Sequence, residues 1–223
     1  MSERTPIEIH PDAAAVARRG AQVIAAHAQA AIGARGSFAL AVSGGRTPWA
    51  MFAELAAQEI DWPQVTIYQV DERIAPAGDS TRNLTDLLTS LPEPARERLC
   101  PMPVEDTDLD AAAHSYAAQL PQRFDLIHLG LGPDGHTASL APGDPALEVL
   151  DRDVALSGPY QGQRRMTLTY SVLNRASARL WVVTGEDKVD ALASLREHDQ
   201  SIPAGRVKPE DSLILADAAA AGV

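Results

Sequence analysis

Residues 37–48 read SFALAVSGGRTP, an apolar run that ends in two glycines and is followed by Thr47 and Pro48. A short apolar run closed by glycines is typical of a buried parallel strand. Proline is tolerated in the first turn of a helix, so Thr47-Pro48 indicates where a helix begins. The segment therefore predicts a strand, a tight turn and a helix that continues to about Gln58.

The same pattern recurs along the chain. Apolar runs at 65–70, 124–129 and 179–183 each end in polar or glycine-rich residues, and a helical pattern over 186–197 follows the last run. Strands that alternate with helices imply βαβ units and a mainly parallel sheet. We therefore expect residues 1–223 to form a single Rossmann-like α/β domain, with a mainly parallel sheet flanked by helices.

Three further segments complete the expected topology. Residues 12–34 are rich in alanine with a helical pattern, and Asp12 is positioned to cap that helix. Residues 212–215 predict a last short strand before an alanine-rich tail. The pattern over 143–170 is less regular and leaves room for a short antiparallel excursion.

The composition excludes several classes of protein. With 45% hydrophobic residues, the chain is neither disordered nor fibrous. No stretch approaches the ~18 consecutive apolar residues of a membrane span, so we expect no membrane partner. The net charge of −11 repels phosphate backbones, so we expect no nucleic-acid partner.

The N-terminal residues and the cysteine content point to a compartment. The segment 1–12, MSERTPIEIHPD, lacks the apolar core of a signal peptide. The single cysteine, Cys100, cannot form an internal disulfide, which suits a reducing environment. We therefore expect a cytoplasmic protein. The histidines and the cysteine show no metal-ligand spacing, so we predict no metal, and no cofactor.

Ligands of open α/β sheets bind at the carboxyl ends of the strands. Four such ends carry polar groups here, and they are 43–46, 71–73, 130–136 and 185–188. Polar residues scattered at random along the chain would not be expected to fall at four strand ends on the same edge of the sheet. These segments are therefore the candidates for the functional site.

Ser43-Gly44-Gly45 joins a predicted strand to a predicted helix. Glycines allow a tight turn in which several amide N–H groups face one anion at the positive end of a helix, so a phosphate fits there. A plain strand-to-helix turn explains the same residues. A serine-hydrolase elbow is a further alternative, although Ala41 stands where the G-x-S-x-G pattern requires glycine.

The segment 130–136, GLGPDGH, contains a literal G-x-G-x-x-G after a strand. We reject a dinucleotide site, because Pro133 and Asp134 occupy the span that should offer free amides to a pyrophosphate. The alternative is acid–base chemistry by His136, oriented by Asp134 two residues earlier. A structural histidine that donates to a backbone carbonyl is the competing interpretation.

Charged residues at two other strand ends suggest a site for an anion. Asp71-Glu72-Arg73 places two acids and a base after an apolar run, either as a solvated strand end with an internal ion pair or as part of the site. Arg165 and Lys188 lie near predicted turns. Cations in a cleft can create a local positive pocket even in an acidic protein, although Arg164 is more typical of surface charge.

Together these segments resemble the 6-phosphogluconolactonase family, which is related to the glucosamine-6-phosphate deaminase/isomerase group. The resemblance covers about 37–207, and GPDGHTASL is its most specific element. The matching segments are AVSGGRTP at 41–48, VDER at 70–73, DSTRN at 79–83, GLGPDGHTASL at 130–140 with Pro142-Gly143, RRMTLT at 164–169 and TGEDK at 184–188.

The resemblance implies an enzyme that hydrolyses 6-phospho-D-glucono-1,5-lactone to 6-phospho-D-gluconate, in the oxidative pentose phosphate pathway. Its partner would be a small-molecule sugar phosphate lactone. The resemblance makes His136 the general base, with Asp134 and Asp71 as its polar surroundings. It assigns substrate and phosphate contacts to Ser43, Gly44, Gly45, Arg73, Asn83, Arg165, Lys188 and Arg206.

Two departures from the family pattern affect substrate packing. Ala141 takes a position that is usually aromatic, and 79–83 replaces a shorter DSN segment. The closest alternative is an amino-sugar-phosphate deaminase/isomerase, whose histidine is assisted by a carboxylate five residues later. Here that position is Ala141, although Asp144 lies three residues further on. A non-catalytic sugar-phosphate sensor would keep the cradle and lose the base, so His136 disfavours it.

Overall fold

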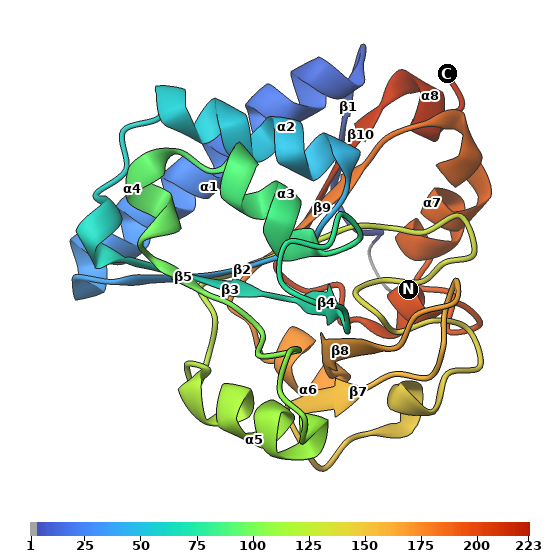
Figure 1. Ribbon diagram of the computed structural model, residues 1–223. Helices are drawn as coiled ribbons and strands as arrows, with labels where there is room; N and C mark the ends of the chain where they lie inside the picture. The colour runs from blue at the N-terminus through green and yellow to red at the C-terminus, as the bar shows by residue number, and fades with distance from the viewer. Residues whose placement is uncertain (1–3) are drawn as a thin grey trace.

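The computed structural model describes residues 4–223 (Figure 1). Its centre is a seven-stranded sheet in which every pair of neighbouring strands is parallel. The strands, in spatial order, are β1 (Ile7–His10), β10 (Ser212–Asp217), β9 (Arg179–Val183), β6 (Leu126–Leu129), β2 (Phe38–Val42), β3 (Val65–Gln69) and β5 (Leu99–Cys100). The expected mainly parallel α/β sheet is confirmed.

A second, three-stranded sheet is antiparallel. It has the order β4 (Asp71–Arg73), β8 (Arg165–Leu168) and β7 (Val154–Leu156). Strands β7 and β8 are the antiparallel excursion expected within 143–170, and β4 joins them from outside that range. This pairing corrects the interpretation of Asp71–Arg73 as the mere end of the preceding strand, because these residues pair with β8 instead of continuing along β2.

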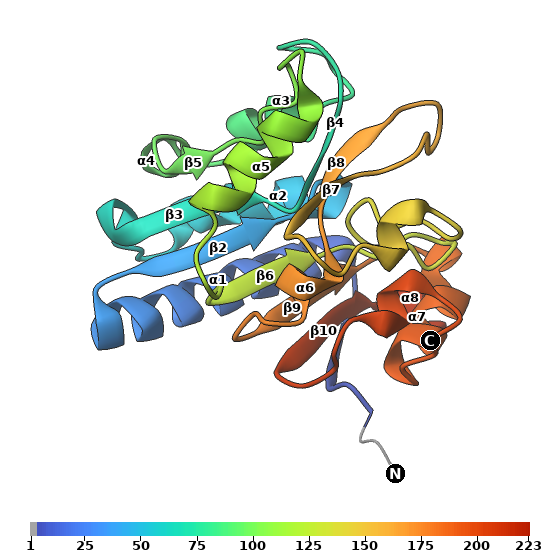
Figure 2. The same cartoon turned by 90° about the horizontal axis from the view of Figure 1, so that it is seen from below.

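Helices cover both faces of the large sheet. The helices are α1 (Ala13–Arg35), α2 (Arg46–Glu54), α3 (Asn83–Ser90), α4 (Glu93–Arg96), α5 (Leu109–Gln119), α6 (Tyr170–Leu173), α7 (Val189–Arg196) and α8 (Ala218–Ala221). Single 3₁₀ turns are η1 (Leu55–Ala57), η2 (Trp62–Gln64), η3 (Pro145–Glu148), η4 (Glu186–Lys188) and η5 (Pro203–Arg206). Figures 1 and 2 show α1 to α4 on one side of the sheet and α5, α6 and the small sheet on the other.

Alternation along the strands divides the core in two. Leu40 and Leu180 belong to the cluster under α1 and α2, whereas their neighbours Ala41 and Trp181 belong to the cluster on the opposite face. Successive side chains of a strand point to opposite faces, so strands buried on both sides must be apolar throughout. This is why these strands appear in the sequence as continuous apolar runs.

Helix α1 begins and ends at recognisable signals. The Asp12 carboxylate accepts a 2.7 Å hydrogen bond from the Ala15 amide, and Gly36 ends the helix with a φ of 75°. A β-carbon on Gly20 would lie 2.3 Å from the sulfur of Met51, so glycine allows α1 to pack closely against α2. The predicted cap at Asp12 is confirmed.

The remaining boundaries differ from the predictions in small ways. The helix after Thr47-Pro48 ends at Glu54 and continues only as a 3₁₀ turn to Ala57. Strands β1 and β5 were not predicted, because each is short and lies at an edge. Cys100 lies in β5 and is half-buried. Within residues 4–223, no helix is both long and apolar enough to span a membrane.

The strand order creates a crevice. From β2 the chain continues to β3 on one side, whereas from β6 it continues to β9 on the other. The carboxyl ends of β2 and β6 therefore form the switch point at which ligands of such sheets bind. Figure 2 shows the β7–β8 hairpin, in orange, and the loop after β6, in yellow, projecting beyond the sheet at this end.

Candidate active site

A cavity of about 470 Å³ lies at the crevice and collects residues from four strand ends. Apart from Asp134 and Arg206, every residue predicted for the site lines it. These are Ser43, Gly44 and Gly45 after β2, Asp71 and Arg73 on β4, Asn83 at the start of α3, His136 after β6, Arg165 on β8 and Lys188 after β9. Residues distant in sequence thus meet around one space.

His136 and Asp134 form a pair at the wall of this cavity. His136 Nδ1 lies 2.6 Å from Asp134 Oδ1, and the His136 side chain is 21% exposed. A carboxylate beside Nδ1 fixes the proton of a neutral imidazole on that nitrogen, which leaves the lone pair on Nε2. Hydrogen bonds from the His136 side chain and from Tyr160 keep the pKa of Asp134 below its ordinary value, although burial acts in the opposite direction.

The glycines of 130–136 serve to pack this pair. The Gly132 amide donates to the His136 carbonyl at 2.8 Å, and the Gly135 amide donates to the Gly132 carbonyl at 3.0 Å. A β-carbon on Gly132 would lie 1.9 Å from His136 Nδ1 and 2.7 Å from Asp134 Oδ1. The G-x-G-x-x-G pattern is therefore explained by close packing against a histidine, which agrees with rejecting a dinucleotide site.

Ser43-Gly44-Gly45 forms the turn between β2 and α2. Gly45 has a φ of 136° and a carbonyl that accepts from the Trp49 amide. The Ser43 hydroxyl is buried without a hydrogen-bond partner in the described part of the chain, and the residue lines the cavity. Unpaired donors at the start of a nine-residue helix suit an anion.

His128, on β6, contacts the backbone of this turn. Its Nδ1 accepts a hydrogen bond from the Ser43 amide at 3.3 Å, and the ring of Phe52 contacts it edge-on with centroids 5.6 Å apart. Complete burial lowers the pKa of His128 to about 3, so the ring is neutral. Sequence reasoning missed this residue. The signal was a polar side chain inside the apolar run FDLIHL at 124–129.

Cationic side chains surround the cavity. Arg165 is only 4% exposed and its Nε has no hydrogen-bond partner in the described residues; burial lowers its pKa, although Asp71 acts against that shift. Lys188 lies 2.9 Å from the Asp187 carboxylate. Arg73 donates a hydrogen bond to the Asn83 side chain. A local positive field therefore exists in a protein of net charge −11.

The two acids of Asp71-Glu72-Arg73 have different surroundings. Asp71 lines the cavity and accepts a 2.5 Å hydrogen bond from the Ser139 hydroxyl. Glu72 is fully buried and accepts hydrogen bonds of 2.8 Å from the amides of Asn83 and Leu84, which fixes the start of α3. Asp71 is therefore placed to meet a ligand, whereas Glu72 holds Asn83 in position.

Known proteins are similar to this chain in sequence and in fold. A family model described as "Glucosamine-6-phosphate isomerases/6-phosphogluconolactonase" matches residues 11–215. The chain belongs to this family.

Curated relatives in the family span most of the chain. A 6-phosphogluconolactonase of Nostoc is 33% identical over 232 residues, covering 96% of this chain and 96% of its own length. A 6-phosphogluconolactonase of Rattus norvegicus is 38% identical over 213 residues, covering 85% of this chain and 81% of its own. The range that the family model matches, 11–215, includes every strand end that lines the cavity.

Solved structures agree in fold. A 6-phosphogluconolactonase of Shewanella baltica superposes with a TM-score of 0.86 at 25% identity, covering 97% of this chain and 99% of that one. One from Trypanosoma brucei gives a TM-score of 0.87 at 22% identity, with 99% of both chains covered. At the latter identity the likeness concerns the fold alone.

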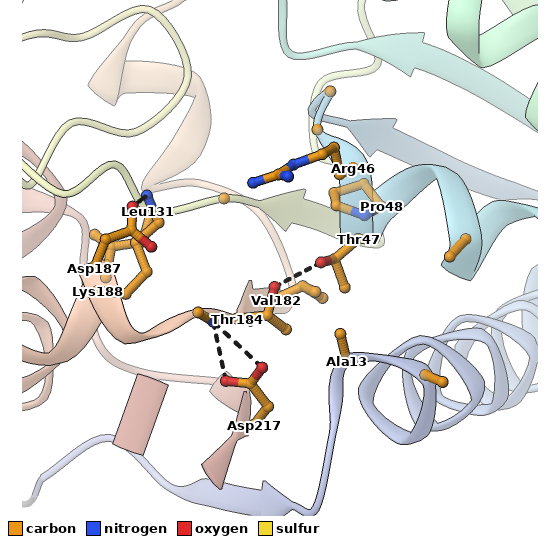
Figure 3. A pocket seen from close by; sticks show the side chains of 16 residues that line it. Ala13, Arg46, Thr47, Pro48, Leu131, Val182, Thr184, Asp187, Lys188 and Asp217 are labelled. Carbon is orange, nitrogen blue, oxygen red and sulfur yellow. Dashed lines mark hydrogen bonds and ion pairs between the residues drawn. The ribbon is translucent and has the colours of Figure 1, made fainter. Parts of the chain in front are cut away.

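A second cavity, of about 610 Å³, adjoins the first across Gly44, Gly45 and Lys188 (Figure 3). Figure 3 shows Arg46 extending from the start of α2 toward the side on which Lys188 lies. At its floor the hydroxyls of Thr47 and Thr184 are 2.6 Å apart. The two cavities share the turn after β2, so the crevice is open on both sides of that turn.

Two residues considered in the sequence lie away from the cavity. Arg206 pairs with Glu148 at 3.1 Å and is not among the lining residues. Asp144 accepts hydrogen bonds from the amides of Ala146 at 2.8 Å and Gly158 at 2.9 Å. Both carboxylate oxygens of Asp144 therefore have backbone amides as hydrogen-bond partners.

Tyr160, in the turn between β7 and β8, is a second residue that sequence reasoning missed. Its hydroxyl donates to Asp134 Oδ2 at 3.0 Å and lies 3.2 Å from His136 Nδ1. No spacing rule relates position 160 to position 134, so only the fold brings them together. Among residues 4–223, no cluster of three or more acidic, histidine or cysteine side chains could hold a metal ion.

Proposed function

We propose that this chain hydrolyses 6-phospho-D-glucono-1,5-lactone to 6-phospho-D-gluconate, a step of the oxidative pentose phosphate pathway. The observation that carries the proposal is the placement of His136, which shares one cavity with the Ser43-Gly44-Gly45 turn and with Arg165. A base at one wall and an anion cradle at another match a substrate whose ester and phosphate lie at opposite ends.

The phosphate is proposed to bind at the turn after β2. Amides at the start of α2 and the Ser43 hydroxyl would donate to its oxygens, while Arg165 and Lys188 would neutralise its charge. Asp71 and Asn83 lie along the same cavity and would face the sugar. Fixing the phosphate sets the position of the lactone carbonyl, and positioning of this kind can supply several kcal/mol of barrier reduction.

The chemical step follows from the tautomer of His136. With Nδ1 held by Asp134, the Nε2 lone pair removes a proton from water as the water oxygen bonds to C1. The carbonyl oxygen becomes an oxyanion, which cationic side chains or backbone amides of the cavity would stabilise. Collapse breaks the bond from C1 to the ring oxygen, and the imidazolium returns its proton to that oxygen.

Four further expectations, on substrate class, nucleic acid, compartment and domain organisation, belong to the same proposal. The substrate is a small molecule, and the acidic chain has no nucleic-acid partner. The enzyme works in the cytoplasm. The 223 residues act as one catalytic domain.

The main competing activity is deamination or isomerisation of an amino sugar phosphate. Two observations favour the lactonase. Position 141, five residues after His136, is a buried alanine, and both carboxylate oxygens of Asp144 accept backbone hydrogen bonds. A non-catalytic sensor of sugar phosphates has no need for the hydrogen-bonded pair of His136 and Asp134.

The decisive experiment measures hydrolysis of freshly prepared 6-phosphogluconolactone, with the spontaneous opening of the lactone subtracted. Glucosamine 6-phosphate is assayed in parallel. We expect rapid hydrolysis of the lactone and no release of ammonia from the amino sugar. Ammonia release with no lactonase activity would replace this proposal by the deaminase.

The phosphate contacts predict a change in KM. Arg165→Ala and Lys188→Ala should each raise KM for the phosphorylated lactone at least 10-fold, because each removes a charge from the cradle. Arg18→Ala, on the exposed side of α1, is the control for loss of a cation. Equal rates on gluconolactone without its phosphate would contradict the assigned cradle.

A further inference from the structure

The turn between β7 and β8 holds Tyr160 in a defined position. The Tyr160 amide donates to the Gln163 carbonyl at 3.0 Å, and the Gln163 amide donates back at 3.2 Å. Between them, Gln161 and Gly162 have φ values of 52° and 81°. Two central residues with positive φ make a tight hairpin turn whose twist matches that of the strands. Tyr160 therefore projects from a rigid hairpin.

The Tyr160 hydroxyl completes a triangle with the proposed base. It donates to Asp134 Oδ2 at 3.0 Å, while Asp134 Oδ1 lies 2.6 Å from His136 Nδ1. The hydroxyl oxygen is also 3.2 Å from Nδ1. Each oxygen of the carboxylate thus has its own partner, which prevents Asp134 from rotating away from the imidazole. Burial and the bond to Asp134 raise the pKa of Tyr160, so the phenol keeps its proton as a donor.

The Tyr160 ring contacts the proposed phosphate ligand. The Arg165 guanidinium carbon lies 5.0 Å from the ring centroid, within cation–π range. Arg165 is almost completely buried, and its Nε has no hydrogen-bond partner in the described residues. The aromatic face therefore restricts the orientation of this buried cation.

We propose that Tyr160 is a positioning residue that orients the His136–Asp134 base through its hydroxyl and the phosphate-binding Arg165 through its ring. The inference rests on the proposed lactonase function. It assigns two separable roles to one side chain, because the hydroxyl and the ring contact different partners. A hairpin outside the large sheet thereby sets the relative placement of base and anion site.

Two substitutions separate the roles. Tyr160→Phe keeps the ring and removes the hydroxyl, so kcat should fall about 10-fold with KM within twofold of the wild type. Tyr160→Leu removes both, so KM should also rise about fivefold. Tyr68→Phe is the matched control, since its hydroxyl donates to the Gln119 carbonyl at 3.1 Å and the residue does not line the cavity.

The pH profile provides a readout that a merely structural role would leave unchanged. In Tyr160→Phe the Asp134 carboxylate loses its phenol partner and keeps the imidazole, so the electrostatic surroundings of the base change. The pH profile of kcat/KM should therefore differ from that of the wild type, whereas the profile of Tyr68→Phe should coincide with it. A Tyr160→Phe enzyme with wild-type kcat and wild-type profile would overturn the hydroxyl role.

Binding of inorganic phosphate, measured by calorimetry, tests the ring without the lactonase reaction. Tyr160→Phe should bind phosphate as the wild type does, and Tyr160→Leu severalfold more weakly. Equal binding by all three proteins would overturn the ring role. A wild-type protein that binds phosphate but does not hydrolyse the lactone would refute the proposed function instead, so the two failures are distinguishable.

Discussion

Two histidines eight positions apart show how the fold assigns chemistry to a side chain. His128 lies within β6, is fully buried, and accepts a hydrogen bond from the Ser43 amide. His136 lies in the following loop, with 21% of its side chain exposed, and its Nδ1 faces the Asp134 carboxylate. One lies in β6 and the other in the loop that follows it, and only His136 lines the cavity.

Their neighbours imply opposite tautomers. Nδ1 of His128 accepts an N–H, so its proton is on Nε2, which is buried with no partner in the described residues. Nδ1 of His136 faces a carboxylate, so its proton is there and Nε2 is free to act as a base. The first ring therefore serves as a structural acceptor beneath the phosphate turn, and the second as the base.

The largest expected effect comes from removing the base. His136→Ala should lower kcat by roughly 10²–10⁴-fold with a smaller change in KM, because proton transfer is lost while the phosphate cradle remains. The comparison is made with the purified variant after subtraction of spontaneous lactone opening. Near-full activity in this variant would mean that the base lies elsewhere.

The next effect tests the close packing beneath His136. In Gly132→Ala the new methyl group would lie 1.9 Å from Nδ1 and must displace the ring. A displacement of about 1 Å can cost about 10²-fold in rate, so kcat should fall by about that factor. Circular dichroism should remain that of the wild type.

Gly33→Ala, in α1, is the control for glycine replacement. A β-carbon there meets no heavy atom within 4 Å, and the position has no positive φ. This variant should keep wild-type kcat. If Gly132→Ala were equally active, the loop would have to be wide enough to accept the methyl group, and the packing argument would fail.

The sequence predicted the large sheet because its central strands are buried on both faces. Apolar runs such as 38–42 are then continuous, and glycine or polar residues follow them directly. Asp71–Arg73 was harder, since the chain leaves one sheet and enters another after Val70 with no turn residue between. Short edge strands such as β1 and β5 have too few residues to show an alternation of apolar and polar side chains.

Site residues could be predicted from sequence where motifs and strand ends coincide. The Ser43-Gly44-Gly45 turn and His136 are examples, because the turn follows β2 directly and His136 lies in the glycine-rich loop after β6. Tyr160 and His128 could not be found in this way. Tyr160 reaches Asp134 only through an antiparallel hairpin, and His128 acts through the backbone of another strand. Contacts of that kind depend on tertiary packing, and no fixed interval between residues in the sequence reveals them.

The smallest effect tests the buried histidine through stability. Burial lowers the pKa of His128 from its ordinary value of 6.5 to about 3, so below pH 6.5 the unfolded chain takes up a proton that the folded chain does not. The free energy of unfolding therefore decreases as pH falls, and between pH 7.5 and 5 this group alone removes about 2 kcal/mol.

His128→Asn keeps an acceptor for the Ser43 amide and cannot titrate. Urea unfolding of both proteins over this range should show the wild type's advantage shrinking by about 2 kcal/mol, because contributions from the other titrating groups cancel in the difference. Parallel pH dependences would instead mean that His128 accepts a proton in the folded protein, and its assignment as a neutral support for the phosphate turn would be wrong.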